Sequence, residues 1–94
     1  MLIYEGQNNN EQLFLNATNI IHSLTKSLDK KELLLLYGLY KQALCGNNTT
    51  STPFIVDLKA VSKWNAWYSH KGKPKRVAVK EYIELVDALL LKYQ

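Results

Sequence analysis

The stretch from Asp29 to Gly46, DKKELLLLYGLYKQALCG, says more about the fold than any other part of the chain. Asp29 is a favourable N-cap residue, and Glu32 three places later completes the pattern of a capping box. A dense apolar run follows, and Gly46 supplies a C-terminal stop. The stretch therefore predicts a helix that begins after Asp29 and runs to Leu44.

Apolar spacing on either side predicts three more helices. The first follows a polar lead-in, Gln7–Asn10, and its apolar residues are Leu13, Ala17, Ile20 or Ile21, and Leu24. The third spans about Asp57 to His70 and is closed by Gly72. The fourth begins at Pro74, a residue suited to the first helical position. Its apolar stripe consists of Ala78, Tyr82, Val86, Leu89 and Tyr93.

The connection from Gly46 to Val56 lacks helical periodicity and is long for a link between helices. A helix from Asp29 to Leu44 is about 24 Å long at 1.5 Å per residue. The connection reaches about 36 Å when extended, so it can travel the whole length of a bundle. No segment alternates with period two. The expected fold is an all-α, four-helix up-down-down-up bundle with one long crossover loop between helices 2 and 3.

Length and composition predict a single small domain over residues 1–94. Apolar types make up 47% of the chain and charged types 21%, which is typical of a globular protein. The one cysteine, Cys45, excludes an internal disulfide framework and any multi-cysteine zinc site. A reducing compartment suits such a chain, and the N-terminus has no secretory-signal pattern, so we expect a cytoplasmic protein.

The charge distribution points to an anionic partner. The formal net charge is +4, and eight basic residues between Leu33 and Lys80 face only one acid, Asp57. Nucleic acid, a phospholipid headgroup or a phosphorylated small molecule would each match this balance, and so would a simple solvated lysine-rich surface.

Two phenols and several ammonium groups form the candidate binding set. Tyr37, Tyr40 and Lys41 lie at i, i+3 and i+4, on one face of the second helix, and Lys59 and Lys63 are one turn apart on the third. Together they are suited to grip a phosphate and stack on a base. Ordinary amphipathic packing is the alternative for the tyrosines.

Trp64 and Trp67 are expected in the core, as is Tyr82 on the inner stripe of the fourth helix. His22 and His70 are expected at the surface or its boundary, and they lack partners at metal-ligand spacing. No nucleophile elbow, P-loop or dinucleotide glycine pattern is present, so the sequence does not predict an enzyme.

Three motifs together resemble the acyl-CoA-binding protein family. They are Tyr37-Gly38-Leu39-Tyr40-Lys41-Gln42-Ala43 followed by Gly46, then Lys63-Trp64-Asn65-Ala66-Trp67 with Lys71-Gly72, and Tyr82-Ile83-Glu84-Leu85-Val86. The resemblance extends from about Leu13 to Tyr93. It implies an up-down-down-up bundle that binds one long-chain fatty acyl-CoA, with no other cofactor and no catalysis, and that acts as a monomeric carrier and pool former.

The resemblance also implies roles for individual residues. Tyr37, Lys41 and Lys63 resemble the residues that hold the ribose 3′-phosphate, and Tyr40 resembles the one against which adenine packs. Tyr82 is a further implied contact to the CoA portion. The remaining implied contacts are Leu33 and Leu34 along the acyl groove and Ala17 on the first helix.

Four departures from the family pattern stand out. His22 replaces a lysine, Val61 occupies a position that often carries one, and Thr52-Pro53-Phe54 replaces a basic-Pro-Gly turn. Lys73-Pro74-Lys75-Arg76-Val77 replaces a polar, acidic helix start. Within the basic flank, which we define as Lys71, Lys73, Lys75, Arg76 and Lys80, the cations would suit either transient docking on anionic membranes or solubility alone.

Other readings of the chain remain at this point. The same lysines and tyrosines would serve a helical nucleic-acid-binding module, or a module that binds anionic membranes. A hydrolase would have to use Ser62, Ser69 and His70. As a carrier, the protein would exchange ligand with enzymes that use acyl-CoA, and no nucleic acid is expected as a partner.

Overall fold

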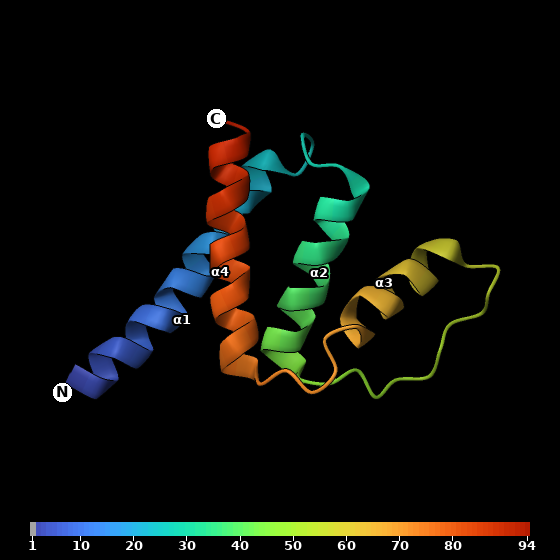
Figure 1. The fold of residues 1–94 in the computed structure, drawn as a ribbon, viewed down its shortest axis with the longest axis horizontal. Coiled ribbons are helices and arrows are strands. Elements are labelled where there is room, and N and C mark those ends of the chain that lie inside the picture. The colour runs from blue at the N-terminus through green and yellow to red at the C-terminus, as the bar shows by residue number, and fades with distance from the viewer. Residues whose placement is uncertain (1) are drawn as a thin grey trace.

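The computed structural model describes residues 2–94, which contain helices and no strand (Figure 1). The elements are α1 (Leu2–Ile21), a short 3-10 helix η1 (His22–Leu24), α2 (Lys30–Cys45), α3 (Leu58–Tyr68) and α4 (Lys75–Lys92). Within these residues no helix is both long and apolar enough to cross a bilayer. The all-α class predicted from the spacing is confirmed.

The start of α2 is capped as the sequence predicts. The Glu32 backbone N–H donates to Asp29 Oδ1 at 2.8 Å, and the Asp29 N–H donates to Glu32 Oε1 at 2.9 Å. These two bonds satisfy orphan donors at the helix N-terminus. At the other end Gly46 adopts φ 78°, a conformation that an L side chain rarely accepts, and the helix stops there.

Glu32 also ties the beginning of α2 to the end of α4. Lys92 Nζ and Tyr93 Oη donate to its two carboxylate oxygens, each at 2.6 Å. The hydrogen bond from Lys92, followed by those from Tyr93 and the Asp29 backbone, lowers the pKa of Glu32 from 4.5 to about 2. Two helices distant in sequence are therefore joined by one carboxylate.

Helix α1 is longer than expected and presents a different stripe. It begins at Leu2, whereas the apolar spacing predicted a start near Leu13 after a polar lead-in. Once a helix is nucleated, each added residue gains a hydrogen bond, so polar residues can extend it. From Asn10 onward, where burial is described, the buried residues of α1 are Phe14, Ala17 and Ile21, and Leu13 is half exposed, so the predicted first position was off by one.

Helix α3 is shorter than expected, and its tryptophans are not core residues. It ends at Tyr68, and the turns that follow carry the chain through His70. Trp64 and Trp67 are half-buried. Their indole N–H groups donate to carbonyl oxygens of the crossover loop, from Trp64 to Thr50 at 3.1 Å and from Trp67 to Gly46 at 2.7 Å. The prediction of core tryptophans was wrong because these side chains fasten the loop to α3.

Helix α4 carries the predicted apolar stripe. Ala78, Tyr82, Val86 and Leu89 are buried, and Tyr93 packs partly against them. Pro74 precedes the helix as N-cap with ψ 147°, one position before the expected one, and its carbonyl accepts the first helical hydrogen bonds. Its missing N–H costs nothing there.

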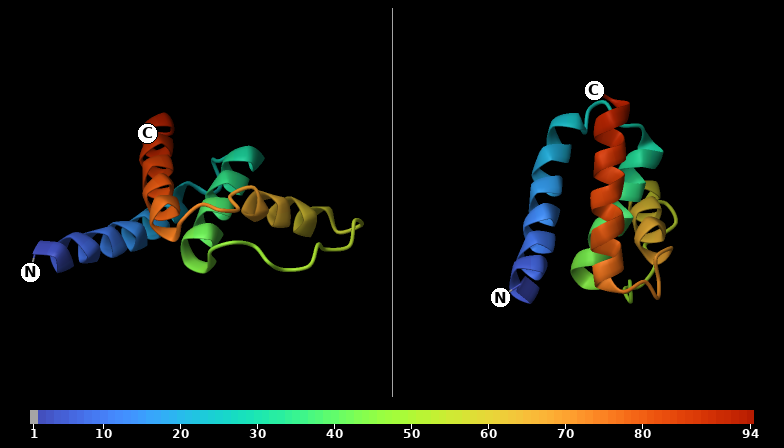
Figure 2. Two further views of the ribbon diagram at one scale, coloured as in Figure 1. Left: turned by 60° about the horizontal axis from the view of Figure 1, so that its bottom comes forward. Right: turned by 60° about the vertical axis from the view of Figure 1, so that its left-hand side comes forward.

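The four helices are arranged up-down-down-up, as predicted (Figures 1 and 2). Helices α1 and α4 run in one direction, and α2 and α3 run in the other. The core lies where α2 and α1 pack against α4, and α3 packs on the far side of α2. The principal-axis extents of the molecule are 50 × 32 × 15 Å, so the bundle is flattened along one axis.

Candidate ligand-binding site

Three aromatic rings from three helices meet at the centre of the bundle. Phe14 of α1 lies 5.1 Å from Tyr82 of α4 and 6.0 Å from Tyr40 of α2, centroid to centroid. Tyr40 and Tyr82 are 6.1 Å apart. These distances are in the favourable range for aromatic pairs. Tyr40 and Tyr82, which the sequence analysis named as separate candidate contacts, therefore lie in one aromatic cluster.

The two tyrosines differ in exposure. Tyr82 is only 4% exposed, whereas Tyr40 is 36% exposed. Burial, together with the neighbouring Tyr40 phenol, raises the pKa of Tyr82 to about 12. Tyr40 therefore offers a ring for stacking, with Tyr82 as its support.

Phe14 was missed by sequence reasoning. It occupies the position directly after Leu13, and its spacing of three and seven to Ala17 and Ile21 was the available signal. Two adjacent apolar residues cannot be ranked by helical spacing alone, because either starts a plausible stripe. The rotation of α1 about its own axis, which its packing against α4 fixes, decides which one is buried.

The second part of the candidate site lies on the seam between α2 and α3. Lys63 Nζ lies 5.2 Å from the ring centroid of Tyr37, and Lys41 Nζ lies 4.7 Å from the ring of Trp67. Both lysines therefore cross from one helix to an aromatic ring on the other. Neither forms an ion pair with a carboxylate among the described residues. Their charges are available to an external anion.

A close backbone approach makes this seam possible. Gly38 is buried, and a Cβ atom placed on it would lie 2.3 Å from the carbonyl oxygen of Ala66 and 2.8 Å from its carbonyl carbon. Such contacts are far inside van der Waals distance. The hydrogen at this position lets α2 and α3 approach closely enough for their lysine–aromatic pairs to form.

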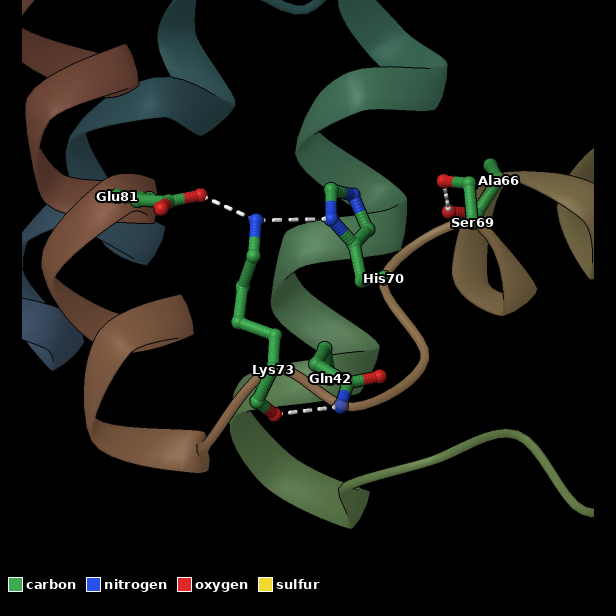
Figure 3. A network of polar contacts seen from close by, with 6 residues as sticks. All are labelled: Gln42, Ala66, Ser69, His70, Lys73 and Glu81. Atoms are coloured by element: carbon green, nitrogen blue, oxygen red, sulfur yellow. Dashed lines mark hydrogen bonds and ion pairs between the residues drawn. The ribbon is translucent and has the colours of Figure 1, made fainter.

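A polar network fixes the turn between α3 and α4 (Figure 3). Gln42 is fully buried and its amide N–H donates to the Lys73 carbonyl at 2.8 Å. Lys73 Nζ pairs with Glu81 of α4 and lies 3.1 Å from His70 Nδ1. Burial and then the Lys73 charge lower the pKa of His70, so the imidazole is neutral at neutral pH. One cation of the basic flank is therefore engaged internally.

The same network argues against a hydrolytic site. The Ser69 hydroxyl donates to the Ala66 carbonyl of its own helix at 2.8 Å (Figure 3). The Nδ1 atom of His70 faces Lys73 rather than a serine. Neither of these contacts joins Ser69 to His70 as a nucleophile–base pair, although both residues line the groove between α2 and α3 together with Ser62. Among the described residues, no group of three His, Cys, Asp or Glu side chains is placed to hold a metal ion.

The remaining predicted residues are spread around these two clusters. Leu34 lines a shallow groove of about 510 Å³ between α2 and α3, together with Leu35 and Ala66. Leu33 is partly exposed at the start of α2. Ala17 is buried on α1, one turn after Phe14 of the aromatic cluster. A larger hollow of about 1130 Å³ lies between α1 and the N-terminal half of α4, and none of the eight predicted residues lines it.

Comparisons with known proteins agree on one family. A family model described as "Acyl CoA binding protein" matches residues 11–86. The chain is 45% identical over 80 residues to "Acyl-CoA-binding protein homolog" of Drosophila melanogaster, covering 85% of this chain and 93% of that one. It is 45% identical over 82 residues to "Acyl-CoA-binding protein" of Saccharomyces cerevisiae, covering 87% and 94%.

A solved structure supports the same relationship. The crystal structure of Oryza sativa Acyl-CoA-Binding Protein 2 superimposes with a TM-score of 0.85 at 38% identity. The match covers 88% of this chain and 92% of the rice chain. Sequence and fold are therefore similar to the same group of proteins over nearly their full length.

Proposed function

Because the chain belongs to the acyl-CoA-binding protein family, we propose that it binds long-chain fatty acyl-CoA esters non-covalently and serves as their intracellular carrier and pool former. Two observations carry this proposal. The Tyr40 ring is partly exposed, and on the seam between α2 and α3 two lysines form no ion pair with a carboxylate among the described residues. Stacking and phosphate binding are the two contacts that a CoA nucleotide requires.

We propose that Tyr37, Lys41 and Lys63 hold the ribose 3′-phosphate. The seam brings Lys63 to Tyr37, and Lys41 projects from the same face of α2. Each charge-assisted hydrogen bond to a phosphate contributes about 1.5–3 kcal/mol. The phosphate would replace the aromatic rings as the partner of both ammonium groups.

Tyr40 is the proposed stacking surface for adenine, and Tyr82 the proposed further contact to the CoA portion. Stacking of a base on an aromatic side chain contributes about 1–3 kcal/mol. Phe14 is buried and supports the Tyr40 ring from the α1 side, with 14° between the two ring planes. Ala17, the proposed first-helix contact, is small enough to bring α1 close to α4.

Leu33 and Leu34 are the proposed beginning of the acyl-chain groove. Leu33 is exposed and Leu34 lines the hollow between α2 and α3. Each methylene removed from water contributes about 0.8 kcal/mol. Tight binding then requires both ends of the ligand, because ordering losses offset part of either contribution.

The domain acts as a carrier and not as an enzyme, and binding of nucleic acid is not favoured. We further propose that residues 1–94 form one acyl-CoA-binding domain, which works as a monomer in the cytoplasm and passes ligand to enzymes that use acyl-CoA. The single free cysteine, Cys45, supports a reducing compartment because its exposed thiol would oxidise elsewhere.

Calorimetric titration of the delipidated protein with palmitoyl-CoA, CoA and palmitate in parallel tests the proposal. Palmitoyl-CoA is expected to bind at one site and far more tightly than either fragment. Equal affinity for palmitate and palmitoyl-CoA would contradict the proposed nucleotide contacts. No heat of binding with palmitoyl-CoA would contradict the function itself.

A further inference from the structure

Four large apolar side chains project into solvent where the crossover loop enters α3. Phe54, Ile55, Val56 and Leu58, which we call the crossover tip, are between 72% and 86% exposed. Single exposed apolar residues are common on protein surfaces, but a contiguous group with so little cover marks an interaction site. None of these side chains belongs to the apolar core.

The crossover tip contains a hydrogen-bonded turn. The Asp57 N–H donates to the Phe54 carbonyl at 2.9 Å and closes the chain on itself. Before the turn, the Trp64 indole fastens the loop at Thr50. After it, the Asp57 carboxylate caps α3 by accepting from the Ala60 N–H at 3.1 Å. The turn is thus anchored on both sides with its apolar side chains outward.

The tip also stands at one end of the long axis of the molecule. Figure 1 shows the loop reaching beyond α3, on the side opposite the N-terminus, and the left view of Figure 2 shows the same projection. A flat partner can therefore meet the tip without colliding with α1 or α4. This position suits contact with an extended surface.

The charges around the tip are positive. Lys59 follows Leu58 of the tip directly and is exposed on the first turn of α3, whereas Lys63 reaches the Tyr37 ring on the seam. Asp57 is the only acid between Leu33 and Lys80, and its carboxylate is occupied at the helix cap. An apolar tip next to Lys59, on a chain with a formal net charge of +4, matches a bilayer interface that carries anionic headgroups.

We propose that the crossover tip inserts into the interfacial region of an anionic membrane, with Lys59 against the headgroups. This docking is separate from acyl-CoA binding and from the basic flank. A second copy of the chain is a poorer occupant, because four side chains on one turn offer much less than the roughly 800 Å² per partner that stable interfaces bury.

Vesicle co-sedimentation with the full chain tests the proposal. The vesicles contain phosphatidylcholine with 30% phosphatidylserine, or phosphatidylcholine alone. Phe54→Ser combined with Ile55→Ser is expected to lower partitioning onto the anionic vesicles by roughly tenfold or more, because full burial of even one such side chain shifts an equilibrium about tenfold. Lys59→Gln is expected to lower it about fivefold on anionic vesicles only.

Leu91→Ser is the matched control, because Leu91 is 69% exposed on α4, outside the tip. It is expected to partition like the wild type, and circular dichroism verifies that each variant is folded. The proposal is overturned if the wild-type protein does not bind anionic vesicles, or if the tip variant and the control behave alike. Sedimentation equilibrium showing a dimer that Phe54→Ser dissociates would also overturn it, in favour of self-association.

The proposal that the protein carries acyl-CoA and the proposal that the crossover tip docks on membranes can be refuted independently. Palmitoyl-CoA titration without vesicles reports only on the carrier function, and vesicle binding without ligand reports only on the tip. A protein that binds vesicles through the tip but not palmitoyl-CoA would refute the first proposal and support the second. A protein that binds palmitoyl-CoA but not anionic vesicles would support the carrier function and refute membrane docking by the tip.

Discussion

Replacing Lys63 by methionine removes the ammonium group while keeping an unbranched side chain on α3. The Lys63 Nζ atom lies over the Tyr37 ring, has no carboxylate partner among the described residues, and is exposed. Its loss in the free protein therefore costs only an exposed cation–π contact, about 0.5–1 kcal/mol. The variant is expected to remain folded.

The effect on ligand binding is expected to be larger. Losing one charge-assisted hydrogen bond to the 3′-phosphate costs about 1.5–3 kcal/mol, and the exposure of Lys63 favours the lower end of that range. The dissociation constant for palmitoyl-CoA is thus expected to rise about tenfold. For palmitoyl-3′-dephospho-CoA it is expected to change by less than about twofold, since the partner of the lysine is missing.

Calorimetric titration of both ligands against both proteins measures this difference directly. Lys80→Met is the matched control, because Lys80 is an exposed lysine on α4, away from the seam. The reasoning is refuted if Lys63→Met weakens both ligands equally, or if Lys80→Met weakens palmitoyl-CoA binding as much. Either result would mean that general charge, and not a specific phosphate contact, governs affinity.

Three further changes have distinct expected results. Tyr40→Leu should weaken palmitoyl-CoA binding about tenfold by removing the stacking ring, with unchanged far-ultraviolet circular dichroism; a loss of helicity would instead show that Tyr40 is a packing residue. Gly38→Ala should lower the free energy of unfolding by about 1–3 kcal/mol, because its Cβ would meet the Ala66 carbonyl, and an unchanged urea midpoint would contradict the close approach. Glu32→Gln should lower the melting temperature at pH 7. Because Lys92 lowers the pKa of Glu32 to about 2 in the folded state, its contribution is present above about pH 4.5 and is lost as pH falls toward 2, so a difference from wild type that persists at pH 2 would contradict the assignment.

Local structure followed from residues close together in the sequence. The capping box of Asp29 and Glu32, the stop at Gly46 and the stripe of α4 depend on contacts within one or two turns, and the structure has all three. The length of the crossover was enough to predict parallel α2 and α3. The same local patterns brought Tyr37, Tyr40 and Lys41 to one helix face before any packing was known.

Tertiary packing decided what local patterns leave open. Helical spacing cannot tell Leu13 from Phe14, since the buried one depends on how α1 crosses α4. The tryptophans of α3 were expected inside, but hydrogen bonds to a loop without periodicity hold them at its edge. The sequence likewise did not determine the exposure of Phe54, because the burial of a loop residue depends on which other segments pack against it. In the structure Phe54 is exposed and does not belong to the apolar core.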